Sequence, residues 1–225
     1  MSIDLFAVSA EPTAVVDERA GTLRSGMQKD GRPVSLATWR FTTGDPDVAA
    51  KLAELYGGDV SSWETTTEEN LQVITEAKSI DIIVDGINSS MVLWGTKGKI
   101  RECDGTSQMP DDKGIRKDCA CELALADKKA DAKAGTGCGP QTAIYFTLAD
   151  LPGVGSWRFF GGGWTLAKDI QPVEAAFVEA GKVPQYASLA KRLVEFTTGS
   201  GEEVSYQTPD LVLKGAAEND EGEPF

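Results

Sequence analysis

The stretch Ile80-Asp81-Ile82-Ile83-Val84-Asp85 decides the fold class. Its aliphatic and acidic side chains alternate in the manner of a β-strand with one buried face. Asp85-Gly86 is a turn signal, and Met91-Val92-Leu93-Trp94-Gly95 follows where a partner strand is expected. The sequence therefore predicts a small antiparallel meander in the middle of the chain.

Further strand patterns lie on both sides of this stretch. Short runs rich in β-branched and aromatic residues, which favour a pleated surface, occupy residues 34–41, 142–148 and 156–160. Near the end of the chain, Gly199-Ser200-Gly201 separates residues 189–198 from residues 202–213. This arrangement predicts a closing hairpin, and a helix over residues 185–196 is the alternative that the apolar pattern leaves open.

Two segments carry helical signals. In the first, Asp45 can cap the helix, Pro46 suits the first helical position, and Gly57-Gly58 suits the turn that ends it. The second covers residues 164–180, where Pro172 either begins the regular part or kinks the helix. The expected apolar faces are Val48, Leu52 and Leu55 in the first helix, and Ile170, Val173, Phe177 and Val178 in the second.

Together these patterns predict a single α+β domain over residues 1–213, with a mostly antiparallel sheet and about two helices. A cysteine-containing insertion is expected at about residues 100–140. Residues 1–33 have the composition of an extended arm with a hairpin at Lys29-Asp30-Gly31, because Asp-Gly favours a tight turn. Residues 214–225 form an acidic tail that is predicted to be disordered.

The insertion holds all four cysteines of the chain, which are Cys103, Cys119, Cys121 and Cys138. The sequence between them is too polar to form a core, so a metal or a pair of disulfides is needed to order it. Four thiolates suit a tetrahedral zinc site, which is structural because no position stays open for water. Reduced thiols and disulfides remain alternatives, because Cys-x-Cys is not the usual zinc spacing.

Composition excludes several kinds of function. The chain has no histidine, which removes histidine-based nucleophilic and acid–base catalysis. A formal net charge of −13 opposes phosphate binding over most of the surface and favours basic protein partners, such as DNA-binding enzymes. Four basic residues near the start are candidates for a local basic strip, although solvated loop charges are the expected interpretation: Arg19, Arg24, Lys29 and Arg32.

Targeting and membrane signals are missing from the sequence. No apolar run reaches the ~20 residues that span a bilayer, and Met1-Ser2-Ile3-Asp4-Leu5-Phe6 has neither the basic start nor the apolar run of a signal peptide. We therefore expect a cytoplasmic protein without membrane partners, a setting that disfavours stable disulfides.

Five tryptophans could form a stacking platform for single-stranded nucleic acid: Trp39, Trp63, Trp94, Trp157 and Trp164. Aromatic residues on a sheet are more often part of the core, and the acidic charge is wrong for a nucleic-acid surface. Gly161-Gly162-Gly163 precedes a predicted helix but lacks the lysine and the glycine spacing of a phosphate loop. Binding of a phosphate group is therefore not expected there.

Several short segments, taken in order, form a recognisable ensemble. They are residues 4–8, 31–34, 39–46, 93–95, 102–105, 119–121 and 151–158, among them Trp39-Arg40-Phe41-Thr42-Thr43-Gly44-Asp45-Pro46 and Leu151-Pro152-Gly153-Val154-Gly155-Ser156-Trp157-Arg158. In this order the chain resembles the recombination directionality factors that temperate actinophages use with large serine integrases. The resemblance extends from the N-terminus to about residue 213.

The resemblance implies a non-enzymatic accessory protein. Such a factor binds its cognate large serine integrase and switches site-specific recombination from integration (attP × attB) to prophage excision (attL × attR). It acts by protein contact, without needing sequence-specific DNA binding, and no catalytic residues carry over to this chain. The alternatives are a phage single-stranded DNA-binding or recombination-mediator protein and a small metalloenzyme, the latter needing an open metal position.

Overall fold

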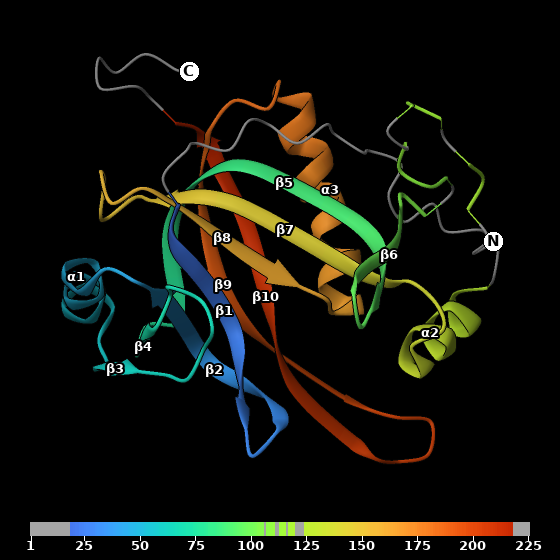
Figure 1. Cartoon of the computed structure of the whole chain (residues 1–225), viewed down its shortest axis with the longest axis horizontal. Helices are drawn as coiled ribbons and strands as arrows, with labels where there is room; N and C mark the ends of the chain where they lie inside the picture. The colour runs from blue at the N-terminus through green and yellow to red at the C-terminus, as the bar shows by residue number, and fades with distance from the viewer. Residues whose placement is uncertain (1–18, 106, 111–112, 116, 120–123, 218–225) are drawn as a thin grey trace.

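A computed structural model describes residues 19–105, 107–110, 113–115, 117–119 and 124–217. Figure 1 shows this part as a curved sheet with one helix packed across it and two helices at its ends. The helices are α1 (Pro46–Tyr56), α2 (Leu125–Ala134) and α3 (Trp164–Glu179). The strands are β1 (Arg19–Lys29), β2 (Arg32–Thr43), β3 (Val60–Ser62), β4 (Leu71–Ile74), β5 (Ser79–Gly95), β6 (Gly98–Cys103), β7 (Gly139–Leu148), β8 (Ser156–Gly161), β9 (Gln185–Thr197) and β10 (Glu203–Ala216).

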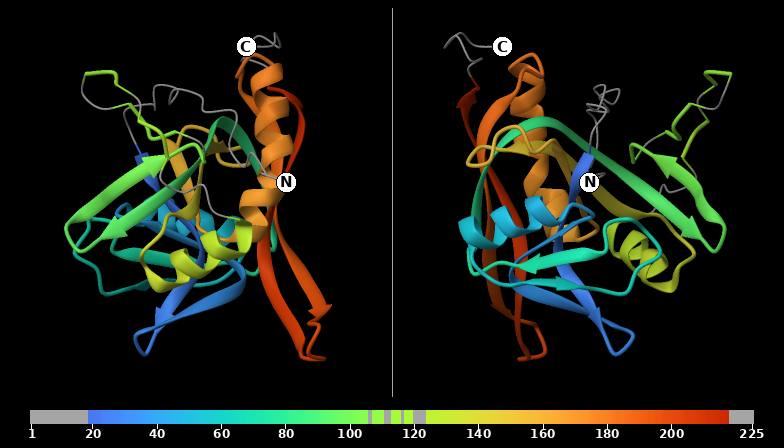
Figure 2. Two further views of the ribbon diagram at one scale, coloured as in Figure 1. Left: turned by 90° about the vertical axis from the view of Figure 1, so that its right-hand side faces the viewer. Right: turned by 60° about the vertical axis from the view of Figure 1, so that its left-hand side comes forward.

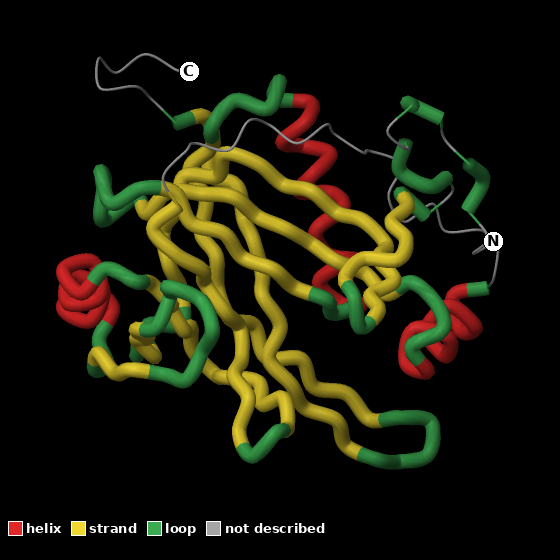
Figure 3. The backbone as a smooth tube through the Cα atoms, in the orientation of Figure 1, coloured by secondary structure: helices red, strands yellow, loops and turns green. Residues whose placement is uncertain are grey.

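The strands join into one ten-stranded sheet in the order β10-β9-β5-β7-β8-β1-β2-β4-β3, with β6 paired to β5 off this path. Every pair is antiparallel except β1 with β8, which is parallel. The sheet curls strongly (Figure 3). Lys191 on β9 donates from Nζ to the Ser25 carbonyl oxygen on β1 at 2.9 Å, although these two strands lie far apart in the strand order. The predicted α+β class with a mostly antiparallel sheet is confirmed.

The core forms because the strands alternate apolar and polar residues. Trp39 and Phe41 of β2 and Trp157 and Phe159 of β8 are fully buried between the walls of the curved sheet. Phe41 and Trp157 meet edge to face with ring centroids 5.1 Å apart. Arg40 and Arg158 alternate with these aromatic residues along β2 and β8, so their side chains point to the opposite face of the sheet. Both belong to the second site described below. Large aromatic side chains bury the most apolar area per residue, so they dominate the stability of this core.

Strand β5 corrects the predicted meander. Residues 80–85 and 91–95 are not two paired strands, because both belong to one continuous strand, Ser79–Gly95. Asp85-Gly86 forms a β-bulge against β7, where the register shifts between Val84 and Gly86, and it does not form a turn. Pairing with β7 runs from Ile82 to Val92 and carries the strand through the local turn signal. The partner of the later half is β6.

The beginning of the described chain also differs from the prediction. Residues 19–29 form strand β1 and not an extended arm, because they pair with β2 on one side and β8 on the other. The hairpin at Asp30-Gly31 is confirmed, with φ values of 51° and 72° at the two turn residues. Residues 1–18, including the segment 4–8 noted above, lie outside the described residues.

The two predicted helices are present. The Asp45 carboxylate accepts the backbone N–H groups of Asp47 and Val48 at 2.8 and 3.2 Å, and Pro46 occupies the first turn of α1. Pro172 lies inside α3, which buries Ile170 and Phe177. Helix α2 was not predicted, and none of its side chains is buried, so no apolar periodicity could reveal it.

The closing hairpin is confirmed as β9–β10, which excludes the alternative helix over residues 185–196. Strand β10 continues to Ala216, and residues 218–225 lie outside the described residues. Within the described ranges, no helix has the length and apolar character needed to cross a membrane.

Candidate functional site

Strand β5 brings the cysteines close together by pairing with β6 on one side and β7 on the other. Met91 on β5 pairs with Cys103 of β6 on one side and with Pro140 of β7 on the other. This register places Cys103 opposite Met91, and Cys138 directly precedes Gly139, which pairs with the next β5 residue, Val92. Cys119 reaches the cluster from the intervening loop, which is tied back by a β-bridge between Ser107 and Asp118. Residues 35 positions apart in sequence are therefore neighbours because β5 pairs with both flanking strands.

The three described cysteines form one buried cluster. Cys103, Cys119 and Cys138 pack with Met91 and Ala167, and half-buried Leu93, Leu125 and Trp164 surround them. The Sγ atoms of Cys119 and Cys103 are 3.2 Å apart, well beyond a disulfide bond length of about 2.05 Å. None of the three is in a disulfide bond. The predicted fourth member, Cys121, lies outside the described residues.

Chemically, the cluster is crowded with sulfur. A hydrogen bond to Cys138, burial, and the nearby Cys119 raise the pKa of the Cys103 thiol far above its usual range. Arg101 donates from Nε to the Cys138 sulfur at 3.4 Å. Among the described residues, no three His, Cys, Asp or Glu side chains are placed in a geometry that would by itself hold a metal ion. A cation between the sulfurs would reverse the pKa shift, because a coordinated thiol is deprotonated.

A second site lies on the outer face of β1, β2 and β8. Glu69, whose side chain is only 13% exposed, accepts from the hydroxyls of Thr22 and Thr42 at 3.0 and 2.8 Å. It also forms ion pairs with Arg19 at 3.4 Å and Arg24 at 3.5 Å. The sequence prediction that these two arginines are loop charges is wrong, because both stand on β1 and converge on one carboxylate. The other two predicted basic residues, Lys29 and Arg32, flank the hairpin turn.

Aromatic contacts complete this arginine network. The guanidinium of Arg40 lies 4.3 Å from the ring centroid of Trp63, and that of Arg24 lies 5.3 Å from it. The Trp63 indole N–H donates to the Glu69 carbonyl oxygen at 2.6 Å, which fixes the ring. Burial and the nearby Arg24 lower the pKa of Arg40. Stacking of this kind holds guanidinium groups that would otherwise repel one another.

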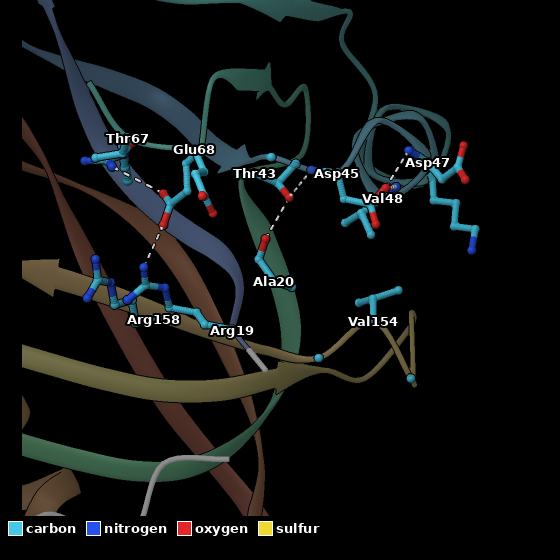
Figure 4. Close-up of a pocket in the computed structure, with 16 residues that line it drawn as sticks. Arg19, Ala20, Thr43, Asp45, Asp47, Val48, Thr67, Glu68, Val154 and Arg158 are labelled. Atoms are coloured by element: carbon cyan, nitrogen blue, oxygen red, sulfur yellow. Dashed lines mark hydrogen bonds and ion pairs between the residues drawn. The ribbon is translucent and has the colours of Figure 1, made fainter. Parts of the chain in front are cut away.

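A cavity of about 700 Å³ opens beside the network (Figure 4). Figure 4 shows Arg19 and Arg158 on one side of it and the start of α1, with Asp45 and Asp47, on the other. Its charged lining is balanced, with four basic side chains (Arg19, Arg24, Lys51 and Arg158) and four acidic ones (Asp45, Asp47, Glu68 and Glu69). Balanced charge does not concentrate phosphate groups, which agrees with the overall acidity of the chain.

The tryptophans divide between core and surface. Trp39 and Trp157 are fully buried, so they cannot stack on bases. The Trp63 ring stacks with the guanidinium groups of Arg24 and Arg40. The Lys129 ammonium lies 5.6 Å from the ring centroid of Trp164. Trp94 is 58% exposed. The expected core role is therefore confirmed for Trp39 and Trp157. The five tryptophans do not form a single stacking platform, because these two are buried.

Comparison with known protein families shows to which family this chain belongs. Residues 20–213 match the model of a family described as Gp3-like, recombination directionality factor-like. The chain belongs to this recombination directionality factor-like family. The match begins in β1 and ends in β10, so it covers the curved sheet except for the outer ends of these two strands, together with the three helices of the described residues. No solved structure matches the chain.

Directionality factors are accessory proteins and not catalysts. Sequence reasoning identified the cysteines through their spacing in a polar insertion. It missed the Arg24–Arg40–Trp63–Glu69 network, because residues from β1, β2 and the loop before β4 meet only in the folded chain. The alternation of Trp39-Arg40-Phe41-Thr42 was the one available signal, since it places Arg40 and Thr42 on a common outer face.

Proposed function

We propose that this protein binds a large serine integrase and switches site-specific recombination from integration (attP × attB) to excision (attL × attR). The family match over residues 20–213 carries this proposal. The acidity of the chain supports it, because a net charge of −13 suits a basic, DNA-bound partner. The partner is contacted as a protein, and sequence-specific DNA binding is not required of the factor.

The switch requires differential affinity. A ligand shifts a two-state equilibrium only by the difference in its affinity for the two states. To invert a 99:1 preference for integration, the factor must bind the excision-competent integrase roughly 10⁴-fold more tightly. An ordinary protein interface can supply such a difference. The factor therefore needs a surface that one arrangement of the integrase presents and the other hides or distorts.

Recombination with purified components tests this function. A candidate large serine integrase is incubated with attL and attR DNA, and separately with attP and attB DNA, with and without the factor. We expect excision only when the factor is present, and inhibition of integration. If neither reaction changes while the integrase alone recombines attP with attB, the proposal is wrong. If instead the factor binds oligonucleotides in a strongly salt-dependent manner, a single-stranded DNA-binding function replaces it.

We further propose that Cys103, Cys119, Cys121 and Cys138 hold a structural zinc ion. Three observations support the assignment: the three described sulfurs share one buried cluster, none is in a disulfide, and the surrounding insertion has little apolar core. Four soft thiolates are the ligands that zinc prefers in structural sites. The ion would tie the loop around Cys119 to strands β6 and β7 and would supply no chemistry to a substrate.

Zinc content tests the assignment directly. Purified protein should contain about one zinc per chain, and the double variant Cys119→Ser with Cys121→Ser should lose it. Ala130→Ser is the matched control, because Ala130 lies exposed on α2 in the same insertion and should keep the metal. A native protein without zinc, or a double variant with unchanged zinc and unchanged protease sensitivity, would refute the proposal.

A further inference from the structure

The arginines on the outer face of β1 and β2 outnumber the carboxylates that neutralise them. Arg24 and Arg40 are direct partners in the sheet register, so their side chains share this face, and both guanidinium groups stack with Trp63. The carboxylate of Glu69 forms its ion pairs with Arg19 and Arg24. Within the residues that the structure describes, no carboxylate forms an ion pair with Arg40. The pair of stacked arginines therefore keeps an excess of positive charge.

Arg40 is the unusual member of this pair. Its side chain is almost completely buried, with 4% of the residue exposed. Its Nε donates to Oε1 of Gln72 at 2.6 Å, which leaves the other four N–H donors of the guanidinium for further partners. Burial and the positive charge of Arg24 lower the pKa of Arg40. A buried cation is normally paired with an anion, because its removal from water is costly.

A cavity gives an incoming group access to the two arginines. Arg24 and Arg40 line a space of about 730 Å³, next to the loop between β3 and β4. Figure 2 shows this loop, in teal, alongside the blue strands β1 and β2. Among the described residues that line the cavity, Glu64 is the one acidic side chain, and it is exposed. The cavity differs in this respect from the one beside α1, whose charges balance.

An exposed aromatic ring borders the same cavity. Leu23 of β1 pairs with Phe159 of β8, and both are buried, so the next residues, Arg24 and Phe160, lie on the outer face. Phe160 is 41% exposed, and the guanidinium of Arg158 lies 5.1 Å from its ring centroid. An apolar contact is therefore available next to the two arginines. We define the arginine–aromatic site as four residues: Arg24, Arg40, Trp63 and Phe160.

The surroundings of the site favour one class of anion. A net charge of −13 repels a polyanion such as DNA from most of the surface, whereas a single carboxylate meets little of that repulsion. Trp63 already stacks with two guanidinium groups, so it offers little free surface to a nucleobase. A carboxylate accepts two parallel N–H groups from one guanidinium, which is the geometry that arginine satisfies best.

We infer that the arginine–aromatic site binds an acidic peptide segment, with an aspartate or glutamate carboxylate on Arg24 and Arg40 and an apolar side chain on Phe160. The bound carboxylate supplies the negative charge that Arg40 lacks within the described residues. Arginine and aromatic side chains that are partly buried before binding are typical of residues that dominate the affinity of an interface.

Nuclear magnetic resonance of the ¹⁵N-labelled full chain tests the inference through the arginine Nε–Hε signals. The probe is the peptide acetyl-Gly-Phe-Asp-Gly-amide, and the same peptide with asparagine in place of aspartate is its control. We expect the aspartate peptide to shift the signals of Arg24 and Arg40 in a saturable manner. The asparagine peptide should bind at least about tenfold more weakly, because it lacks the charge that strengthens the hydrogen bonds.

Two variants locate the binding. Arg24→Gln should weaken binding of the aspartate peptide by roughly tenfold, because one guanidinium is lost. Lys29→Gln is the matched control, since Lys29 lies on the same strand and loses the same charge, but it is exposed and does not line the cavity. It should change affinity by less than about twofold. Circular dichroism checks that both variants are folded.

Each other outcome would overturn the inference. Equal binding of the two peptides would show that the carboxylate is not recognised, and no shift at about 10 mM peptide would exclude a site of useful affinity. If inorganic phosphate or a single-stranded oligonucleotide shifts the same signals at lower concentration than the peptide, the site is a phosphate site. Equal weakening by Arg24→Gln and Lys29→Gln would place the binding elsewhere. The assay contains no integrase, so these results leave the proposed function untouched.

Discussion

The two halves of strand β5 are stabilised in different ways. The first half, around Ile80, Ile82 and Val84, pairs with β7 and β9 and is buried in a large aliphatic and aromatic core. The second half, around Met91, pairs with β6 and β7 and borders a small cluster dominated by sulfur. One strand thus joins a region that folds through apolar burial to a region with a much smaller apolar cluster, for which we propose a zinc cross-link. The two regions should respond to different perturbations.

The largest effect is expected from a change in the aromatic core. Trp157→Ala removes a fully buried ring that packs on Phe41, and it should lower the free energy of unfolding by about 3–5 kcal/mol. Trp94→Ala is the control, since Trp94 is exposed on the second half of β5. Denaturation by urea measures both variants. Similar losses for the two would mean that the core does not dominate stability.

Removal of the proposed zinc ion should affect the cysteine region alone. A strong zinc chelator, or Cys119→Ser with Cys121→Ser, should raise hydrogen exchange and protease cleavage between residues 98 and 138. Amides of β1, β7 and β8 in the aromatic core should stay protected, because their strand pairing does not depend on the cysteines. Uniform loss of protection across both regions would show that the insertion and the core fold as one unit.

A pH titration examines the junction between the two halves. Glu174 of α3 is buried and accepts the backbone N–H of Ser89 on β5 at 3.3 Å. Burial raises the pKa of the Glu174 carboxyl from 4.5 to about 7, and hydrogen bonds from Ser89 oppose the shift only in part. The folded state therefore holds this proton more tightly than the unfolded state. Its contribution to stability is fully present below pH 4.5 and is lost as the pH rises through 7.

The Glu174→Gln variant should flatten that dependence. The amide keeps an oxygen acceptor for Ser89 and does not ionise, so at pH 8 the variant should be more stable than the wild type by on the order of 2 kcal/mol. At pH 4.5 the two should be similar. Asp85→Asn is the comparison variant, because burial also raises the pKa of Asp85, to about 6. If the free energy of unfolding depends on pH in the same way for wild type and Glu174→Gln, the pH dependence does not come from Glu174.

The smallest expected effect is at the cap of α1, which belongs to the core side. Asp45→Ala removes the acceptor for two backbone N–H groups and should cost about 1 kcal/mol. Thermal unfolding measures the loss. Hydrogen exchange in the cysteine insertion should not change, because α1 and α2 lie at opposite ends of the molecule (Figure 1). A change there would mean that the two regions are coupled.

The comparison also explains which features the sequence could predict. Local signals were sufficient for α1, with its cap at Asp45 and its terminal Gly57, and for the β9–β10 hairpin around Gly199-Ser200-Gly201. They failed at Asp85-Gly86, because pairing of β5 with β7 turns that dipeptide into a bulge. A local turn preference of this kind is weaker than two rows of backbone hydrogen bonds contributed by distant strands.

The candidate sites show the same division. The cysteines could be found because chemistry-bearing residues were concentrated in one polar segment. The exposure of the β9–β10 hairpin could not be predicted, since Val194, Phe196, Val204 and Tyr206 have the pattern of ordinary strand residues. Only the point at which β5 stops pairing with β9 reveals that their supporting sheet has ended. Exposure of an apolar strand is a property of the topology and not of the local sequence.

The central claim is that the protein distinguishes two states of the integrase. The most direct measurement is its affinity for the integrase assembled on attL and attR, compared with its affinity for the integrase assembled on attP and attB. The account predicts tighter binding to the attL–attR complex, by a ratio approaching roughly 10⁴ if the switch is complete. Equal affinity for the two complexes would contradict it, because a ligand that binds both states equally shifts neither.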